Sequence, residues 1–346
     1  MTKIKKLIRV IFVVFFSVLV VVYSFEIKDS IISSIGICIN VIIPSMFIFM
    51  VISTYILSSD LHTVIFKPVI FVINKITGYD RDIISIFLLS LIGGYPIGIK
   101  LTNELIAQNK SYSAIADKFI PFCYCISPTF AVTMLGISLY GSIVPGIIIY
   151  ISNVFSCILI AFVYSKIYNI EVKNKKINSG SNGGIIDSIN SSAVTLFKIC
   201  VIIIFFNTII TVIETLLFQS GIVIPDWLKA LLEISNILKI ENISISTLPF
   251  VAGLASFGGI CVILQCISLI NGRYSIKPFI ITRIISSVLS FYFSKLLIHM
   301  NDIYIPAYSI NKHTLFSIST DKISTIFLII MFIILMQKNE KNLKKG

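Results

Sequence analysis

One interrupted apolar segment carries residue types that could hold an anion. Residues 93–98 read Gly-Gly-Tyr-Pro-Ile-Gly and lie within the apolar run 83–106. A continuous helix tolerates this sequence poorly, because glycine costs backbone entropy and proline lacks a backbone N–H donor, so we expect two half-helices that meet there. The second half-helix would begin with N–H groups that lack helical partners, and these groups attract anions. Gly94 would allow a ligand to approach the backbone closely, Pro96 suits the first helical position, and Lys100 follows about one turn later. This arrangement suits the binding of a carboxylate.

A second glycine pair and a Ser-Pro pair interrupt two further apolar runs. Phe257-Gly258-Gly259 breaks the run 248–270, in which Gln265 is a polar side chain, and Ser127-Pro128 breaks the run 115–139. The alternative interpretation is that the glycines only let helices pack closely and that Lys100 snorkels to an interface. Glycine-interrupted segments in matching slots of two halves are typical of a transporter's binding site, so we predict a site rather than packing alone.

The residue patterns of metal sites and of common enzymes do not occur in the sequence. It lacks the G-x-x-x-x-G-K-[ST], H-E-x-x-H and G-x-S-x-G motifs, so we expect neither an enzyme nor a cofactor. Cys123 and Cys125 form a C-x-C pair without a nearby histidine, which is a poor zinc site, and we expect no bound metal. Most of the seven cysteines lie in apolar stretches and are expected to be buried, reduced thiols.

The composition requires a membrane around these elements. The chain has 346 residues, of which 56% are apolar and 13% are charged, and its mean hydropathy is +0.98. An average soluble domain carries about a quarter charged residues, so a soluble globular protein is excluded. The formal charge of +12 comes from cations between apolar runs and at the two ends. These cations indicate topology and not a nucleic-acid partner.

The sequence therefore predicts an all-α polytopic membrane protein with the bilayer as its main partner. A span needs roughly 20 apolar residues, so the chain has room for about eight transmembrane helices, some of them glycine-broken or re-entrant half-helices. The apolar runs are 11–23, 31–57 with Pro44 inside it, 83–106, 115–139, 143–164, 193–217, 248–270, 279–298 and 323–336, and the segments 61–76 and 226–240 are amphipathic. Lys198, Glu214, Arg283 and Lys295 lie near the ends of spans or face each other across loops, and we expect them to be structural.

A polar linker divides the chain into two halves with a similar order of elements. Residues 1–165 form the first transmembrane half, 166–190 the linker and 191–346 the second transmembrane half. Each half has a plain or kinked span, an amphipathic segment, a Gly-Gly-broken span and another span, so we expect an internal repeat, of the inverted kind. Lysines at both ends and in the linker place all three in the cytoplasm. That orientation requires one broken segment, around Gly93 or around Ser127, to enter and leave on the same side.

Several motifs together resemble a known family of membrane proteins. They are Pro44-Ser45-x-Phe47, the element from Gly93 to Lys100, Cys123 to Phe130, Leu232 to Asn236, and Ser256-Phe257-Gly258-Gly259 followed by Gln265 and Arg283. These residues resemble the YlbJ-type sporulation integral membrane proteins, which belong to the wider nucleoside-recognition or Gate-domain superfamily. Ile237 stands where a glycine commonly follows the Glu-x-x-Asn element, and this departure bears on the ligand role of Glu233 and Asn236.

The resemblance implies a function that composition does not. It implies a protein of the mother-cell-derived outer forespore membrane that transports or conducts a small anionic metabolite, dipicolinate first, and is needed for maturation of the spore cortex and core. The alternatives are a transporter for a nucleoside-like solute and a non-transporting scaffold that recruits other sporulation membrane proteins. The candidate substrate-binding residues are Gly93, Gly94, Tyr95, Pro96, Gly98, Lys100, Ser127, Glu233, Asn236, Gly258, Gly259 and Gln265.

Overall fold

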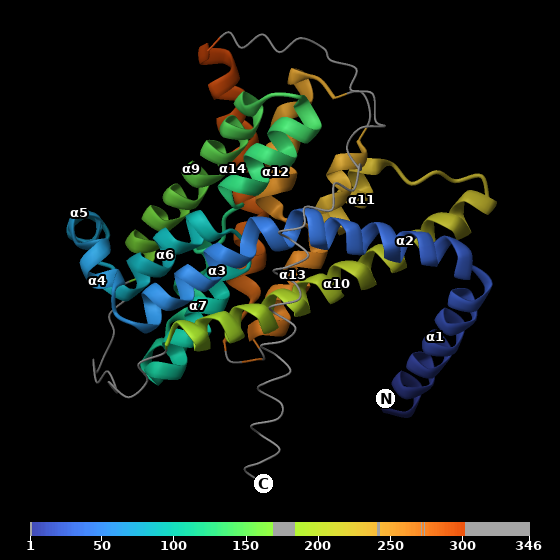
Figure 1. Ribbon diagram of the computed structural model, residues 1–346, viewed down its shortest axis with the longest axis horizontal. Helices are drawn as coiled ribbons and strands as arrows, with labels where there is room; N and C mark the ends of the chain where they lie inside the picture. The colour runs from blue at the N-terminus through green and yellow to red at the C-terminus, as the bar shows by residue number, and fades with distance from the viewer. Residues whose placement is uncertain (1, 169–183, 241–242, 271, 273, 302–346) are drawn as a thin grey trace. The chain divides into compact units, whose positions relative to one another are not determined.

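Every regular element of the described residues is helical (Figure 1). The computed structural model describes residues 2–168, 184–240, 243–270, 272 and 274–301. By internal packing the chain divides into two units, Met1–Ala307 and Tyr308–Gly346. The described parts of both sequence halves belong to the first unit. The predicted span 323–336 and most of the linker lie outside the described residues.

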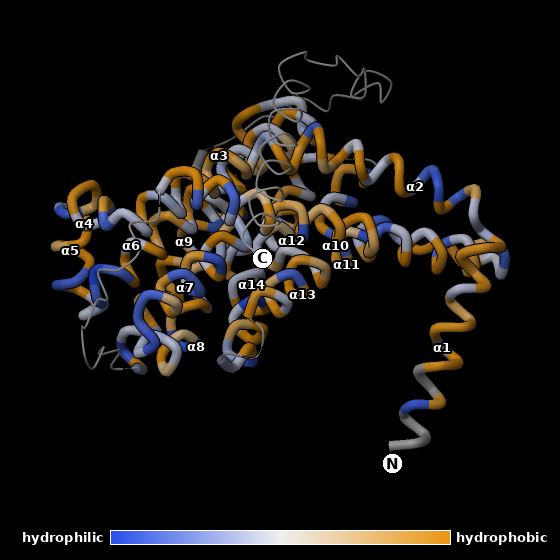
Figure 2. Tube along the Cα trace, turned by 60° about the horizontal axis from the view of Figure 1, so that its bottom comes forward, coloured by the Kyte–Doolittle hydropathy of each residue, from blue (hydrophilic) through white to orange (hydrophobic). Residues whose placement is uncertain are grey.

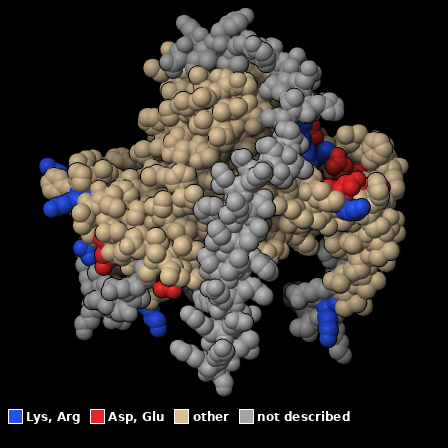
Figure 3. All heavy atoms as spheres, in the orientation of Figure 1, with Lys and Arg blue, Asp and Glu red and all other residues tan. Residues whose placement is uncertain are grey.

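Several helices are long and apolar enough to cross a bilayer. Five such helices occur in the described residues: Ser24–Ser58, Ile143–Ile167, Ile185–Gln219, Ile245–Ile270 and Lys277–Met300. Figure 2 shows long hydrophobic stretches along their traces, and Figure 3 shows that charged side chains are sparse on the face it presents. Large apolar side chains such as Phe197, Phe250 and Ile281 are more than half exposed, as expected next to lipid. The all-α prediction is confirmed for the described residues, and these five helices are consistent with a multi-pass membrane protein, whereas the total of about eight spans and the internal repeat remain predictions.

Two helices of equal length run antiparallel beside each other. The first combines α2 (Ser24–Ile37), a π-helical turn η1 (Cys38–Ile42) and α3 (Ile43–Ser58), and its partner is α10 (Ile185–Gln219); each spans 35 residues. The Tyr23 hydroxyl donates to Gln219 Oε1 at 2.9 Å, just before the first helix begins. Thr211 Oγ1 donates to Ser30 Oγ at 2.8 Å. Near the middle, Cys38 Sγ lies 3.9 Å from the backbone oxygen of Cys200. The π-helical turn lies just before Pro44, where a proline disturbs regular helical hydrogen bonding.

Both glycine breaks separate half-helices as predicted. α6 (Arg81–Gly93) and α7 (Ile97–Gln108) meet at Gly94, whose φ is +79°. α12 (Leu248–Phe257) and α13 (Gly259–Ile270) meet at Gly258, whose φ is +83°. Only glycine adopts these conformations without strain. One detail differs from the prediction, because Pro96 is the N-cap of α7 and not its first helical residue.

Two segments are divided into shorter pieces than their sequences predict. The run 115–139 forms no span: it comprises α8 (Ala116–Phe119), a turn η3 (Ile120–Phe122), non-helical residues and a ten-residue π-helix η4 (Phe130–Leu139). Pro121 and Pro128 each remove a backbone donor there, which favours short pieces. The amphipathic segment 226–240 is likewise divided into α11 (Asp226–Leu232) and a 3₁₀ turn η5 (Ile234–Lys239), with Glu233 extended between them.

The remaining elements close the first unit around this framework. They are α1 (Thr2–Val22), α4 (His62–Ile65), α5 (Lys67–Thr77), η2 (Lys110–Ala114), α9 (Ile143–Ile167), η6 (Ile245–Thr247) and α14 (Lys277–Asn301). α9, α12 and α14 pack together through buried polar side chains. Ser286 Oγ lies 2.6 Å from Ser156 Oγ and 2.7 Å from Ser256 Oγ. Such hydrogen bonds between helices hold membrane bundles together.

Candidate functional site

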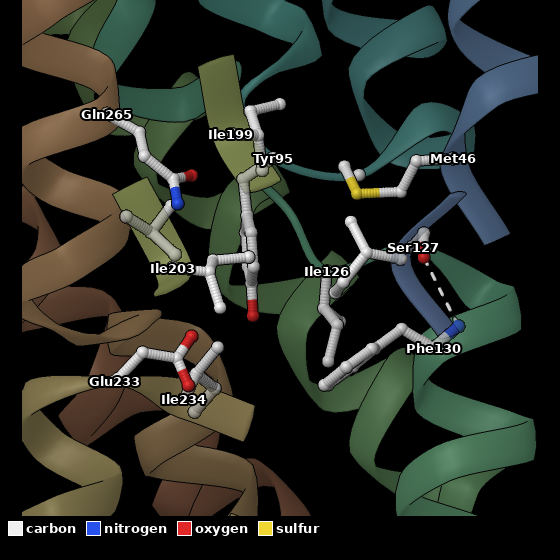
Figure 4. Close-up of a pocket in the computed structure, with 13 residues that line it drawn as sticks. Met46, Tyr95, Ile126, Ser127, Phe130, Ile199, Ile203, Glu233, Ile234 and Gln265 are labelled. Atoms are coloured by element: carbon white, nitrogen blue, oxygen red, sulfur yellow. Dashed lines mark hydrogen bonds between the residues drawn. The ribbon is translucent and has the colours of Figure 1, made fainter. Parts of the chain in front are cut away.

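The interrupted segments of both sequence halves converge on one narrow cavity (Figure 4). Its volume is about 30 Å³, room for about two waters, because one water needs roughly 10–15 Å³ of such space. α3 and α10 contribute apolar walls near the middle of their long helices. The lining residues are Ile42, Met46, Gly94, Tyr95, Ile126, Ser127, Phe130, Ile199, Ile203, Glu233, Ile234, Val262 and Gln265. Five of the twelve candidate residues are therefore brought together: Gly94, Tyr95, Ser127, Glu233 and Gln265.

Gly94 and Ser127 place two helix starts beside the cavity. A Cβ atom added to Gly94 would lie only 2.7 Å from Ser127 Cβ, so the two interrupted segments meet directly at these residues. Ser127 Oγ accepts a hydrogen bond from the backbone N–H of Phe130 at 3.2 Å and thereby caps the helical segment that begins at Pro128 and continues as η4. α7 begins three residues after Gly94. The positive ends of the backbone dipoles of α7 and η4 therefore lie near this region, together with the negative end of α6, which ends at Gly93.

Glu233 is the acidic residue of the cavity wall. Its exposed fraction is 1%, and its carboxylate accepts from the backbone N–H of Ser235 at 2.7 Å and from the Ser235 hydroxyl. The carboxylate thus caps the start of η5. The ion pairs of the described residues do not include Glu233. Figure 4 shows this carboxylate and the amide of Gln265 both directed toward the space beside Ile203.

Tyr95 links the first glycine break to the second half of the chain. Its hydroxyl donates to the backbone oxygen of Ala255 in α12 at 3.0 Å. Its ring stacks on Tyr124 with centroids 4.6 Å apart. Tyr124 in turn lies under the guanidinium of Arg283, at 4.4 Å from carbon Cζ to the ring centroid. Arg283 also donates to the backbone oxygens of Pro121 and Tyr124, so this fully buried cation has acceptors around it.

The other candidate glycines and the candidate proline support packing around the cavity. A Cβ at Gly98 would collide with the backbone oxygen of Cys123, and one at Gly258 would collide with the Tyr124 hydroxyl. A Cβ at Gly259 would lie 3.2 Å from the backbone nitrogen of Ile234. Gly93 packs against Ile97, and Pro96 caps α7. These five residues do not line the cavity, although they fix the close approach of the segments that do.

Lys100 and Asn236 also lie outside the cavity lining. Lys100 is 4% exposed, and its ammonium donates to Glu104 at 2.8 Å, to Ser192 at 3.4 Å and to the hydroxyl of Thr54. It therefore joins α3, α7 and α10, and its role toward a ligand remains a prediction. Asn236 donates to Asn207 Oδ1 in α10 at 3.0 Å and so fastens η5 to that helix.

A second polar cluster, which the sequence did not predict, lies at the start of α6. His62 Nε2 is 3.0 Å from Asp82 Oδ1, and the Tyr112 hydroxyl is 2.6 Å from Asp82 Oδ2. Burial opposes the charge on Asp82, but hydrogen bonds from His62 and Tyr112 and the nearby Arg81 hold the pKa of its carboxyl below the usual value. Burial and the Asp82 carboxylate raise the pKa of Tyr112. Twenty or more residues separate the members in sequence, so no local pattern marks the cluster.

The donor set of the cavity suits hydrogen bonding more than metal binding. Within the part of the chain that the structure describes, no group of three or more His, Cys, Asp or Glu side chains could hold a metal ion. All seven cysteines are buried. Searches of family models, curated proteins and solved structures gave no match to this chain, so its resemblance to the YlbJ-type proteins rests on the sequence motifs.

Proposed function

We propose that this chain is a multi-pass membrane transporter or channel for a small anionic solute, with dipicolinate as the first candidate. The observation that carries the proposal is the convergence of the three interrupted segments and the Glu233 junction on one cavity between α3 and α10. Soluble metabolites cross a bilayer only where protein offers polar groups away from lipid, and broken helices supply such groups from the backbone.

The chemistry of the cavity supports an anion under one condition. The starts of α7 and η4 favour negative charge, while Glu233 disfavours it unless that carboxyl is neutral or paired. An aromatic dianion would then find apolar walls in Ile199 and Ile203 and polar groups in Ser127 and Gln265. The cavity is smaller than such a solute, so transport requires the surrounding helices to separate.

The family resemblance supplies the proposed setting, the outer membrane of the developing forespore. A nucleoside-like solute is the runner-up, because Glu233 and Gln265 could accept and donate hydrogen bonds to a neutral ligand. The scaffold alternative predicts no solute movement at all. A single transport experiment separates the three.

The test is uptake by vesicles that contain only this purified protein. Labelled dipicolinate should enter these vesicles faster than protein-free vesicles. Ile203→Phe, which adds bulk to a cavity wall, should block uptake, whereas Val201→Phe on the same helix should not, because Val201 is 47% exposed and lies outside the cavity lining. Uptake of a labelled nucleoside alone would favour the runner-up. Uptake of neither solute by the unmodified protein would contradict the transport proposal.

A further inference from the structure

We infer that Glu233 is a proton-binding group that couples solute movement to a proton gradient. The inference rests on the proposed transport function and adds its driving force. It starts from an unusual placement: a carboxyl group that is 99% buried, directed into an apolar cavity and held there by Ser235 (Figure 4). Burial makes the charged form of this carboxyl costly, and the two hydrogen bonds from Ser235 offset part of that cost, so binding a proton or a cation would relieve the rest.

The neighbours of Glu233 do not supply a fixed countercharge. Lys239, on the same 3₁₀ turn, favours the charged form of this carboxyl, but its side chain is exposed and the ion pairs of the described residues do not join the two groups. The titratable groups that face it from other elements are Tyr95 beside α7, Cys38 in η1 and Cys261 in α13. Each of these three is neutral when protonated, so none of them neutralises the carboxylate. Arg283 is already surrounded by the backbone oxygens of Pro121 and Tyr124.

A proton fits this cavity better than a metal cation does. Hard cations take about six oxygen ligands, but eight of the thirteen lining residues are Ile, Met, Val or Phe. Ser127 Oγ is engaged by the Phe130 N–H. Glu233 and Gln265 remain as the side chains with carbonyl-type oxygens that are directed into the space. Two such side chains leave a metal ion short of ligands, whereas one carboxyl oxygen is enough for a proton.

Protonation and anion binding would then reinforce each other. A bound anion makes the charged form of Glu233 less favourable, so the anion raises the affinity of Glu233 for a proton, and by linkage the proton raises the affinity for the anion by the same factor. When the cavity opens to a less acidic compartment, the O–H bond of the carboxyl breaks and the proton passes to water. The resulting carboxylate repels the anion, so the two leave together as in symport.

The first test measures the protonated carboxyl without any solute. Dicyclohexylcarbodiimide adds to protonated carboxylic acids in apolar surroundings, and mass spectrometry locates the adduct. In purified protein in vesicles, labelling of Glu233 should fall as the pH rises and should be insensitive to sodium chloride when potassium chloride is the control. Labelling that does not depend on pH, or that sodium ions specifically suppress, would overturn the inference.

The second test measures the coupling in vesicles with an imposed pH gradient. For one proton per solute, a gradient of one pH unit can raise accumulation up to roughly tenfold. In Glu233→Gln the ratio of uptake with and without the gradient should fall to about one, because glutamine keeps the acceptor for Ser235 but cannot release a proton. Glu214→Gln is the matched control and should keep the ratio, because Glu214 pairs with Lys229 and is outside the cavity lining. A gradient response that survives in Glu233→Gln would refute the coupling, whereas no uptake by the unmodified protein would instead refute the transport proposal.

Discussion

A buried ammonium is stable only where acceptors replace the water that it loses, and Lys100 meets this need through partners on three helices. Glu104 supplies the negative charge that balances the Lys100 ammonium. Its second carboxylate oxygen, Oε2, is buried without a hydrogen-bond partner. The sequence predicted that Lys100 lies about one turn into the helix after the glycine break, and the structure has it in the first turn of α7. Spacing along one helix does not reveal which neighbouring helices face a side chain, so the partners Thr54 and Ser192 could not be predicted.

The first prediction concerns this ion pair. Lys100→Met should lower the free energy of unfolding by about 2 kcal/mol, because Glu104 would keep a charge with little solvent around it. Combining it with Glu104→Met should restore part of the loss, as coupled neighbours do. Thermal unfolding in detergent measures both, with Lys295→Met as an exposed-lysine control. Equal stability of Lys100→Met and the control would show that the pair contributes nothing.

The second prediction concerns Asp82 and the pH dependence of stability. Its pKa is held low in the folded protein, so its charge stabilises the fold above the unfolded-state pKa of about 4 and this contribution is lost as the pH falls through the lower, folded value. Asp82→Asn should therefore lower Tm at neutral pH and reduce the fall of Tm under acid conditions. Asp29→Asn, at an exposed carboxylate, should change neither. Parallel Tm curves for Asp82→Asn and the unmodified protein would contradict the assignment.

At the scale of elements, breaks made by glycine and proline were predictable and breaks made by tertiary contacts were not. The half-helices at Gly94 and Gly258 follow from the backbone freedom of glycine and the missing N–H of proline, and both residue types are evident in the sequence. The extended residue Glu233 lies in a segment with ordinary helical periodicity, and the backbone next to it, at Ile234, packs closely against Gly259. That contact joins residues 25 positions apart in the sequence, so the periodicity of 226–240 does not reveal it.

The third prediction tests the close approach at the second break. Gly258→Ala should destabilise the protein by about 1–3 kcal/mol, because alanine strains the positive φ and its methyl group meets the Tyr124 hydroxyl. Tyr124→Phe should relieve part of this loss by removing that oxygen. Gly36→Ala is the control, since no atom lies within 4 Å of a Cβ at that site. Chemical denaturation of the three variants gives the comparison, and equal losses at the two glycines would contradict the packing.

The fourth prediction tests the pairing of the two long helices. Cys38 and Cys200 lie side by side near their middles, so copper phenanthroline should oxidise them to a disulfide in a variant that keeps only these two cysteines. A protease site inserted in the linker would reveal the disulfide. After cleavage, the two fragments should stay joined in the absence of reductant and should separate when reductant is added. The pair Cys38 and Cys266 serves as the comparison, since Cys266 faces Arg283 and Tyr124 instead. Fragments that separate under both conditions would contradict the antiparallel pairing.

For the molecule as a whole, the antiparallel pair bears on the proposed inverted repeat. The two long helices are equal in length, and the second half-helices of the two glycine breaks are also equal in length, because α7 and α13 each have 12 residues. An inverted repeat places equivalent helices antiparallel, and Cys38 and Cys200 occupy nearly the same position within their helices. Sequence order alone suggested the repeat, and this geometry supports it, but equivalence of the remaining elements is still a prediction.

The last prediction concerns orientation in the membrane. From the lysines of the linker we expect the start of α10 to lie in the cytoplasm. A helix of 35 residues is about 52 Å long, more than the bilayer core of about 30 Å, so we expect its far end to lie outside. The antiparallel partner then brings Ser58 to the cytoplasmic side and Ser24 to the outer side. In a background without the seven native cysteines, Ser220→Cys should react with an impermeant maleimide in intact cells, because Ser220 is exposed just after α10 ends. Ser181→Cys, in the linker before the same helix, should react only after the membrane is permeabilised. Labelling of Ser181→Cys from outside would reverse the orientation, and labelling of both from outside would mean that α10 does not cross the membrane.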